Sequence, residues 1–229
     1  ADVEWCREAL KACGGVGRAV VANAGNSNAF TGKAGKLKNE ATLAAMTKTL
    51  GVPKEACFLA ATGVIGEPLA DPNFVGEMLP ELESKLGPAD WEACARAFMT
   101  TDTYPKGAGA TTEIDGTPVA ISGIVKGSGM IMPNMATMLC YVFTDAAIDR
   151  PVLQSMVSAN ADLTFNCITV DSDTSTSDTL LCAATGASGV RVTEKDTAFI
   201  DALRGVMLDL AHQVVKDGEG ATKFVRIAV

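Results

Sequence analysis

The chain has 229 residues, of which 48% are hydrophobic, and a formal net charge of -8. This length allows a sizeable core, while acidic residues spread without long blocks disfavour a surface that binds nucleic acid phosphates. No run approaches the ~18 apolar residues of a membrane-spanning helix, and the opening residues lack the features of a secretory signal. The seven cysteines form no C-x-x-C pair and lie mostly in apolar segments, which is typical of reduced, buried cysteines. We therefore expect a cytoplasmic protein that binds neither nucleic acid nor membranes.

Helices and strands are expected to alternate in the first half of the chain. Apolar residues at helical spacing indicate the helices, and short runs of β-branched and aromatic residues indicate the strands. Pro80 is expected to kink or divide the helix at residues 74–86. Asp115-Gly116 favours a type I′ turn between the strands at residues 111–114 and 117–122. The expected helices are residues 3–12, 39–50, 74–86 and 90–98. The expected strands are residues 18–22, 57–61, 111–114 and 117–122.

The second half continues the alternation. The expected strands are residues 137–143, 165–170 and 179–184. Asp149 is expected to cap a helix with Pro151 in its first turn, and Thr193 is expected to cap a helix over 194–216. That last helix carries an apolar face at helical spacing, formed by Phe199, Leu203, Val206, Met207, Leu210, Val214 and Val215. The chain is therefore expected to be mixed α/β, with sheets packed between helices.

The most informative segment is the glycine-rich loop KGSGMIMPNMATML, which runs from Lys126 to Leu139 and places Thr137 at the start of an apolar strand. Gly127 and Gly129 permit backbone conformations closed to other residues, and Pro133 makes the approach rigid. A buried strand would fix the side chain at its start. Thr137 is therefore a candidate nucleophile.

A threonine nucleophile needs a base, and the only histidine, His212, lies on an amphipathic helix. The sequence therefore gives little support for a Ser-His-Asp type of catalytic triad, which needs a histidine base. Cleavage of the bond between Ala136 and Thr137 would instead free an α-amine, which titrates near ~7.7 to 8.0 and can accept the hydroxyl proton. The alternative is that Thr137 begins a strand only because of its β-propensity, and the segment by itself leaves both interpretations open.

Two stretches resemble ligand-binding loops, one for a dinucleotide and one for calcium, but neither has all the residues that such a loop requires. The stretch 15–19 has two glycines of a dinucleotide loop, but it follows a helix, enters a strand and lacks the third glycine. The stretch from Asp171 resembles a calcium loop, yet Thr176 and Cys182 occupy the positions that need glycine and glutamate. By default it is a polar turn between strands, and we assign it no chemistry.

Taken together, six motifs resemble the ornithine acetyltransferases, also called glutamate N-acetyltransferases, of arginine biosynthesis. Besides the loop at 126–139 they are ANAGNSNAFTG at 22–32, ATGVIG at 61–66, MTTDT at 99–103, DTSTSDT at 173–179 and GEGATKF at 218–224. The resemblance implies a layered αββα fold, with residues 1–229 forming one domain or the greater part of one. It also implies self-cleavage between Ala136 and Thr137, which would give an α segment, 1–136, and the start of a β segment, 137–229.

The same resemblance assigns roles to individual residues. Thr137 would be the nucleophile, and Thr62 and Gly63 would form the oxyanion hole that attack on an acyl carbon requires. Without the resemblance, Thr-Gly after a strand is an ordinary turn.

The substrate contacts implied by the resemblance are Thr100, Lys126 and Glu219, together with Thr137. The choice of Thr100 over Thr101 depends only on its spacing from Lys126. Without the resemblance, Lys126 is a solvated charge at the end of a strand.

The implied reaction is acetyl transfer from N-acetylornithine to glutamate through an acetyl-threonine intermediate, by ping-pong kinetics, with no metal and no bound cofactor. Acetyl-coenzyme A as a second donor is left open. The family also implies paired αβ units, a heterotetramer of two α and two β chains. Three alternatives remain: a related self-cleaving aminopeptidase or hydrolase, an inactive truncated fragment, since family members are longer at both ends, and a binding module without turnover.

Overall fold

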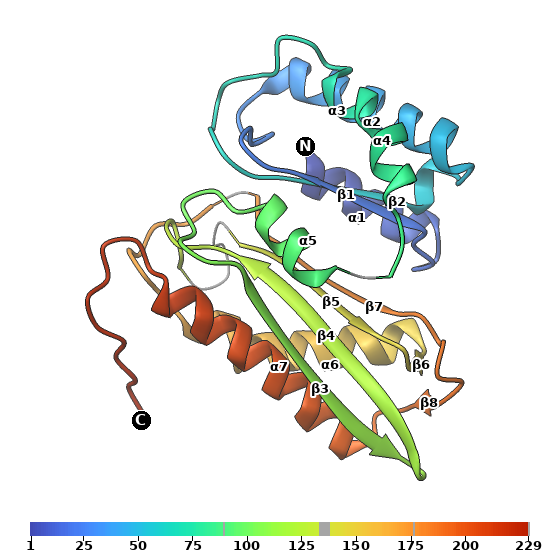
Figure 1. The fold of residues 1–229 in the computed structure, drawn as a ribbon, viewed down its shortest axis with the longest axis vertical. Coiled ribbons are helices and arrows are strands. Elements are labelled where there is room, and N and C mark those ends of the chain that lie inside the picture. Colours follow the sequence, from blue (N-terminus) through green and yellow to red (C-terminus); the bar gives the residue numbers. More distant parts are fainter. Residues whose placement is uncertain (89, 133–137, 176, 229) are drawn as a thin grey trace. The chain divides into compact units, whose positions relative to one another are not determined.

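The computed structural model describes residues 1–88, 90–132, 138–175 and 177–228. The chain divides into two compact units, Ala1–Asp90 and Trp91–Val229. Figure 1 shows the helices and strands of each unit. The mixed α/β class is confirmed, since each unit combines β-sheet with helices.

Unit 1 is built on two parallel strands, β1 (Ala19–Asn23) and β2 (Cys57–Ala61), paired from Ala19 opposite Cys57 to Asn23 opposite Ala61. Every residue of β2 is buried. The remaining elements are α1 (Asp2–Ala12), α2 (Gly32–Leu50), a 3₁₀ turn η1 (Lys54–Ala56), α3 (Phe74–Glu77) and α4 (Leu79–Ser84). The buried core is formed by Leu43, Met46, Cys57, Leu59 and Leu79. Because β2 is buried throughout, the residues that follow it are held at a fixed position in unit 1.

Unit 2 contains a four-stranded sheet in the order β3-β4-β5-β7. The strands are β3 (Lys106–Ile114), β4 (Thr117–Lys126), β5 (Leu139–Thr144) and β7 (Thr179–Ala184). Strand β4 pairs antiparallel with both β3 and β5, and β5 pairs with β7 in parallel. A small second sheet pairs β6 (Ala147–Ile148) with β8 (Arg191–Val192). Strands β4 and β5 therefore bring the two ends of the Lys126–Leu139 loop together, with Lys126 opposite Leu139.

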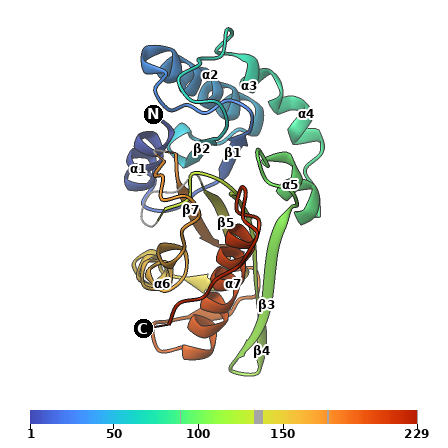
Figure 2. The same cartoon turned by 90° about the vertical axis from the view of Figure 1, so that its left-hand side faces the viewer.

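Helices pack against this sheet. They are α5 (Trp91–Ala97), α6 (Arg150–Asp162) and α7 (Thr197–Lys216); the 3₁₀ turn η2 (Phe165–Cys167) contacts α6 and α7. Figure 2 shows α7 lying along the β3–β4 hairpin. The apolar face expected on α7 is buried except for Val215, which is half-buried. The type I′ turn is confirmed, since Asp115 and Gly116 both have positive φ, 49° and 79°.

Several expected boundaries differ from those observed. Residues 165–170 were expected to form a strand but begin with the 3₁₀ turn η2, because the Cys167 N–H donates to Thr164 O and continues the turn that ends α6. Thr193 does not cap the last helix, which begins at Thr197 after Asp196; the Thr193 hydroxyl instead donates to the Asp196 carboxylate over 2.9 Å. Helix α2 begins at Gly32, seven residues earlier than expected.

The division of the helical pattern at 74–86 is confirmed, because α3 ends at Glu77 and Pro80 lies in the first turn of α4. The cysteines are free, as expected, but Cys94 and Cys167 are exposed rather than buried. Among the described residues, no helix is both long and apolar enough to cross a membrane.

Candidate functional site

Ala136 and Thr137, where cleavage is predicted, lie outside the described residues, but the segments on both sides are described. On the N-terminal side, the backbone N–H groups of Met130 and Ile131 donate to the Asp171 carboxylate over 2.5 and 3.0 Å. On the C-terminal side, the Met138 N–H donates to Asp178 Oδ1 over 3.1 Å. Two carboxylates from one segment therefore hold both sides of the predicted cleavage site.

Asp171 stabilises a strained turn. Met130 has φ +56°, a conformation unusual for a residue other than glycine. The partial desolvation of the exposed Asp171 carboxyl favours its neutral form, but hydrogen bonds from Met130, Asp173 and Ile131 outweigh that effect and hold its pKa below the usual value. The Asp171 segment was assigned no chemistry from the sequence, and its contacts identify it as a support for the loop.

Asp178 lies in a different electrostatic environment. Burial raises the pKa of Asp178 to about 8, although the Met138 N–H and the charge of Lys126 act in the opposite direction. A carboxyl group that titrates near neutrality is therefore hydrogen-bonded to the residue that directly follows Thr137.

Two of the predicted substrate contacts are brought together in unit 2. Lys126, the last residue of β4, donates from Nζ to Thr100 Oγ1 over 2.7 Å. Lys126 is 2% exposed, and burial lowers the pKa of its ammonium group, partly offset by the charges of Asp102 and Asp178. Thr100 and Thr101 are both exposed, so what distinguishes Thr100 is the hydrogen bond from Lys126. The structure therefore pairs Lys126 with Thr100.

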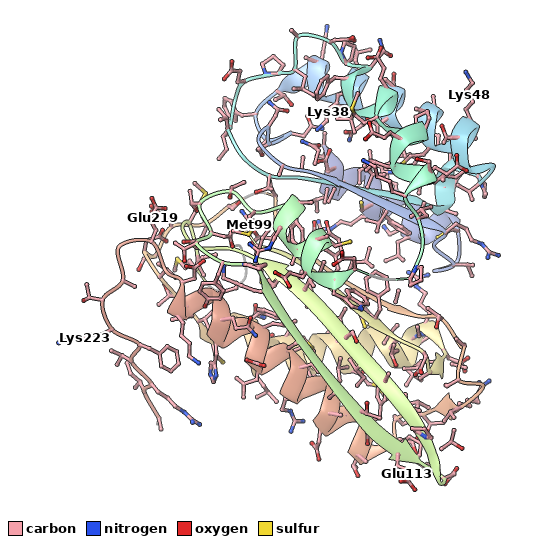
Figure 3. All side chains as sticks on the ribbon, in the orientation of Figure 1. Lys38, Lys48, Met99, Glu113, Glu219 and Lys223 are labelled. Atoms are coloured by element: carbon pink, nitrogen blue, oxygen red, sulfur yellow. The ribbon has the colours of Figure 1, made fainter. Side chains whose placement is uncertain are left out.

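Glu219 reaches the same loop from the segment that follows α7, where Figure 3 labels it. Its backbone N–H donates to Ser128 O over 2.8 Å. A Cβ atom added at Gly129 would lie 2.5 Å from Glu219 Oε2, so the Glu219 carboxylate lies directly against Gly129 and would have to shift for a larger residue there. Glu219, Lys126 and Thr100 therefore surround the beginning of the glycine-rich loop.

The predicted oxyanion residues follow β2 in unit 1. The Thr62 N–H donates to Asn23 O over 3.0 Å, so this backbone group is already paired within unit 1. Gly63 has φ +127°, and a Cβ atom there would lie 2.3 Å from the carbonyl carbon of Gly25. The Asn23 side chain donates to Asn26 O and accepts from Lys38 Nζ, which Figure 3 labels on α2. Asn23 therefore braces the turn that carries Thr62 and Gly63.

His212 is not part of either group of residues. Its ring lies 5.3 Å from the Phe224 ring, measured between centroids, and it is half-buried on α7. Among the described residues, no three His, Cys, Asp or Glu side chains cluster in a way that could hold a metal ion.

Comparisons with known proteins agree with the sequence motifs. The model of the ArgJ family matches residues 1–229. A relative from Ruegeria pomeroyi, named arginine biosynthesis bifunctional protein ArgJ, is 57% identical over 92% of this chain and 51% of its own length. A protein of the same name from Caulobacter vibrioides is 52% identical over 100% of this chain and 58% of its own length. The chain thus spans about half the length of the curated relatives it matches.

A solved structure is also similar. The crystal structure of arginine biosynthesis bifunctional protein ArgJ from Bacillus halodurans has a TM-score of 0.52 and 31% identity, and the match covers 60% of this chain and 70% of that chain. The α/β fold described above is consistent with it.

Proposed function

This chain belongs to the ArgJ family, and on that premise we propose that the protein containing it transfers an acetyl group from N-acetylornithine to glutamate in arginine biosynthesis. The observation that carries the proposal is the contact between Nζ of the buried Lys126 and Thr100 Oγ1 at the start of the loop that leads to Thr137. A buried ammonium complements the carboxylate of an amino acid substrate. The Glu219 carboxylate near Gly129 complements the ammonium group of ornithine.

The first step of the proposed mechanism is self-cleavage. The Thr137 hydroxyl attacks the Ala136 carbonyl carbon, the peptide nitrogen leaves as the α-amine of Thr137, and an ester joins the two residues. Water hydrolyses this ester, which leaves a carboxylate on Ala136 and a free hydroxyl on Thr137. Asp171 and Asp178 support this step by fixing the backbone on both sides of the bond.

The second step is acetyl transfer. The α-amine of Thr137 accepts the hydroxyl proton, and the threonine oxygen attacks the acetyl carbon of N-acetylornithine. Donors from Thr62 and Gly63 would stabilise the oxyanion, an interaction whose loss costs about 3 to 4 kcal/mol elsewhere. Ornithine leaves with the proton, and glutamate then accepts the acetyl group from Thr137 to give N-acetylglutamate. The two half-reactions give ping-pong kinetics and require no metal or bound cofactor.

The intact masses of three proteins test this function: the full-length wild type, Thr137→Ala, and Thr111→Ala as a control at an exposed position of β3. Wild type and Thr111→Ala should each give two fragments, and Thr137→Ala a single chain. After incubation with N-acetylornithine alone, the fragment that begins at Thr137 should gain one acetyl group. A single uncut and unacetylated chain in all three proteins would contradict the proposal and favour an inactive or purely binding protein.

Addition of an acceptor separates the transferase from a related hydrolase. Glutamate should remove the acetyl group from the enzyme as N-acetylglutamate, whereas a hydrolase would release acetate at the same rate with or without glutamate. Repeating the acetylation with acetyl-coenzyme A determines whether that compound is also a donor. We further propose a cytoplasmic assembly of two α and two β chains.

A further inference from the structure

A group of buried charges that the proposed reaction does not use lies beside the substrate contacts of unit 2. Lys106, the first residue of β3, has a side chain that is 0% exposed. Its Nζ lies 2.6 Å from Asp102 Oδ1 and 2.6 Å from Asp217 Oδ2, and these two carboxylates are 0% and 3% exposed. The ammonium also lies 4.9 Å from the centre of the Tyr104 ring. Lys106 is therefore enclosed by two carboxylates and an aromatic face.

The carboxylate of Asp102 holds the backbone on either side of the substrate contacts. Its Oδ1 accepts from the Gly127 N–H over 2.7 Å, and its Oδ2 accepts from the Thr100 N–H over 3.1 Å. Gly127 directly follows Lys126. One carboxylate therefore fixes the backbone of Thr100 and of the residue next to Lys126, and the side chains of Thr100 and Lys126 form the contact.

Asp217 connects the same group to Glu219. Its carboxylate accepts from the backbone N–H and the hydroxyl of Thr103. Its own carbonyl accepts from Ser128 Oγ over 2.6 Å, and Ser128 O accepts from the Glu219 N–H. Lys106 thus joins the two carboxylates that position the segments carrying all three predicted substrate contacts.

The charges of the group balance. Two carboxylates, Asp102 and Asp217, are matched by two ammonium groups, Lys106 and Lys126. Burial would favour the neutral form of Asp102, but hydrogen bonds from Lys106, Gly127 and Thr100 keep its pKa below the usual value. Removing one partner from a buried ion pair leaves an uncompensated charge, which is strongly unfavourable. Without Lys106, the only remaining ammonium of the group is that of Lys126.

We propose that Lys106 is a positioning residue for substrate binding: it neutralises Asp102 and Asp217, so that the Lys126 side chain stays on Thr100 and is available to an anionic substrate instead of pairing with either carboxylate. The inference rests on the proposed function in taking Thr100, Lys126 and Glu219 as substrate contacts. Lys106 itself touches no substrate and takes no part in proton or acetyl transfer.

The test compares three variants of the full-length protein. Lys106→Met keeps an apolar stem and removes the charge. Lys106→Met/Asp217→Asn also removes one carboxylate, while the amide introduced at position 217 retains an acceptor for the Thr103 N–H and a donor for its hydroxyl. Lys195→Met, at an exposed position of the same unit, is the matched control.

The first measurement is steady-state kinetics with N-acetylornithine. Lys106→Met should raise KM at least about tenfold with a smaller change in kcat, because the group then holds two carboxylates and one ammonium. The double variant leaves one carboxylate, Asp102, and one ammonium, Lys126, and should recover a large part of the lost affinity for N-acetylornithine. Lys195→Met should behave as wild type. A purely structural role of the Lys106 stem predicts no recovery in the double variant.

The second measurement is the titration of Lys126, followed by the carbon-13 NMR signal of its Cε and assigned by its loss in Lys126→Arg. The charged groups that act on Lys126 include Asp102, Lys106 and Asp178. Because the charge of Lys106 lowers the pKa of Lys126, Lys106→Met should move this titration to higher pH, and Lys195→Met should not. This readout does not depend on acetyl transfer. If wild type transfers no acetyl group, the proposed function fails, and the titration still decides whether Lys106 controls the charge of Lys126.

An unchanged KM and an unchanged Lys126 titration in Lys106→Met would overturn the proposal. Equal loss of affinity in the single and double variants would also overturn it. If Lys106→Met does not fold, the double variant decides. Failure of both to fold would assign Lys106 to stability alone and likewise overturn the proposal.

Discussion

The Met138 N–H donates a hydrogen bond to Asp178 Oδ1 over 3.1 Å, and the Thr179 N–H donates to Met138 O over 3.0 Å. Both polar backbone groups of the residue after the proposed nucleophile are therefore held by the start of the neighbouring strand, β7. Since β5 pairs with β7 from Leu139 onward, this arrangement extends the sheet to the edge of the predicted cleavage site. It also places a titratable group, Asp178, in a position where its protonation state affects that edge.

The first prediction concerns the pH dependence of stability. The pKa of Asp178 is raised to about 8 in the folded protein because the carboxyl group is buried, whereas an unfolded aspartate titrates near ~3.9. Between these values the folded state keeps a proton that the unfolded state has lost. The free energy of unfolding should therefore fall as pH rises through this window, by at most about 1.4 kcal/mol per pH unit.

Asp178→Asn should remove this contribution, because an amide stays neutral and its oxygen still accepts from Met138. Urea unfolding at about pH 5 and about pH 8 measures the difference. The variant should gain stability relative to wild type at the higher pH, and Asp201→Asn, at an exposed position of α7, should follow wild type. Parallel pH profiles for wild type and Asp178→Asn would contradict the prediction.

Much of the fold could be predicted from the sequence because many elements carry local signals. Asp115-Gly116 determines the β3–β4 turn, Gly51 ends α2 in a left-handed conformation with φ 65°, and Pro80 separates α4 from α3. The expected strand at 165–170 was wrong because Phe165 is apolar and buried in a turn after α6. An apolar run indicates burial, but it does not distinguish a strand from a buried turn.

Less of the candidate site than of the fold could be predicted from the sequence. Motifs indicated Thr100, Lys126 and Glu219, but only the fold brings residues 100 and 126 into hydrogen-bonding distance. Lys106 and Asp217 were missed because they are 111 positions apart in the chain, and only packing makes them an ion pair. Asp171 and Asp178 were visible in a polar segment, yet no spacing rule links them to a backbone about 40 residues away.

The second prediction concerns the turn before the cleavage site. Asp171→Ala removes the acceptor for the N–H groups of Met130 and Ile131. A hydrogen bond to a charged group contributes about 1.5 to 3 kcal/mol where water is excluded and less at an exposed residue such as Asp171. The positive φ of Met130 should then relax, and self-cleavage of freshly translated protein should slow by at least about fivefold.

A time course of fragment formation on denaturing gels measures this effect. Asp173→Ala, in the same exposed segment, is the control and should cleave at the rate of wild type. If both variants cleave at the same rate, Asp171 does not support the cleavage loop.

The third prediction separates two glycines of the ATGVIG motif. Gly66 has φ +81° and open space where a Cβ would lie, so Gly66→Ala should incur only backbone strain, about 1 to 2 kcal/mol. Gly63 has φ +127°, and a Cβ there would lie 2.3 Å from the Gly25 carbonyl carbon and 2.7 Å from the Asn26 nitrogen. Backbone atoms cannot move aside as a flexible side chain can, so Gly63→Ala should lose at least about 2 kcal/mol more than Gly66→Ala. Urea unfolding of both variants measures the difference in their free energies of unfolding. Equal losses of stability would show that the Gly25 backbone moves to accommodate the added Cβ atom.

The fourth prediction tests the choice between two adjacent threonines. Thr100→Val keeps the shape of the side chain and the backbone N–H that bonds Asp102, but removes the acceptor that lies 2.7 Å from Lys126 Nζ. Lys126 is buried, so the loss of a hydrogen bond to its charge should cost about 2 kcal/mol, which corresponds to roughly a 30-fold rise in KM for N-acetylornithine.

Thr101→Val makes the same chemical change one residue later, at an exposed side chain, and should alter KM by less than about twofold. Steady-state kinetics of the two full-length variants therefore compares the hydroxyl that accepts a hydrogen bond from Lys126 with the adjacent hydroxyl of the same motif. A larger effect at Thr101 would mean that Lys126 changes its partner when substrate binds, because only a rearranged Lys126 could depend on the Thr101 hydroxyl more than on the Thr100 hydroxyl that it contacts here.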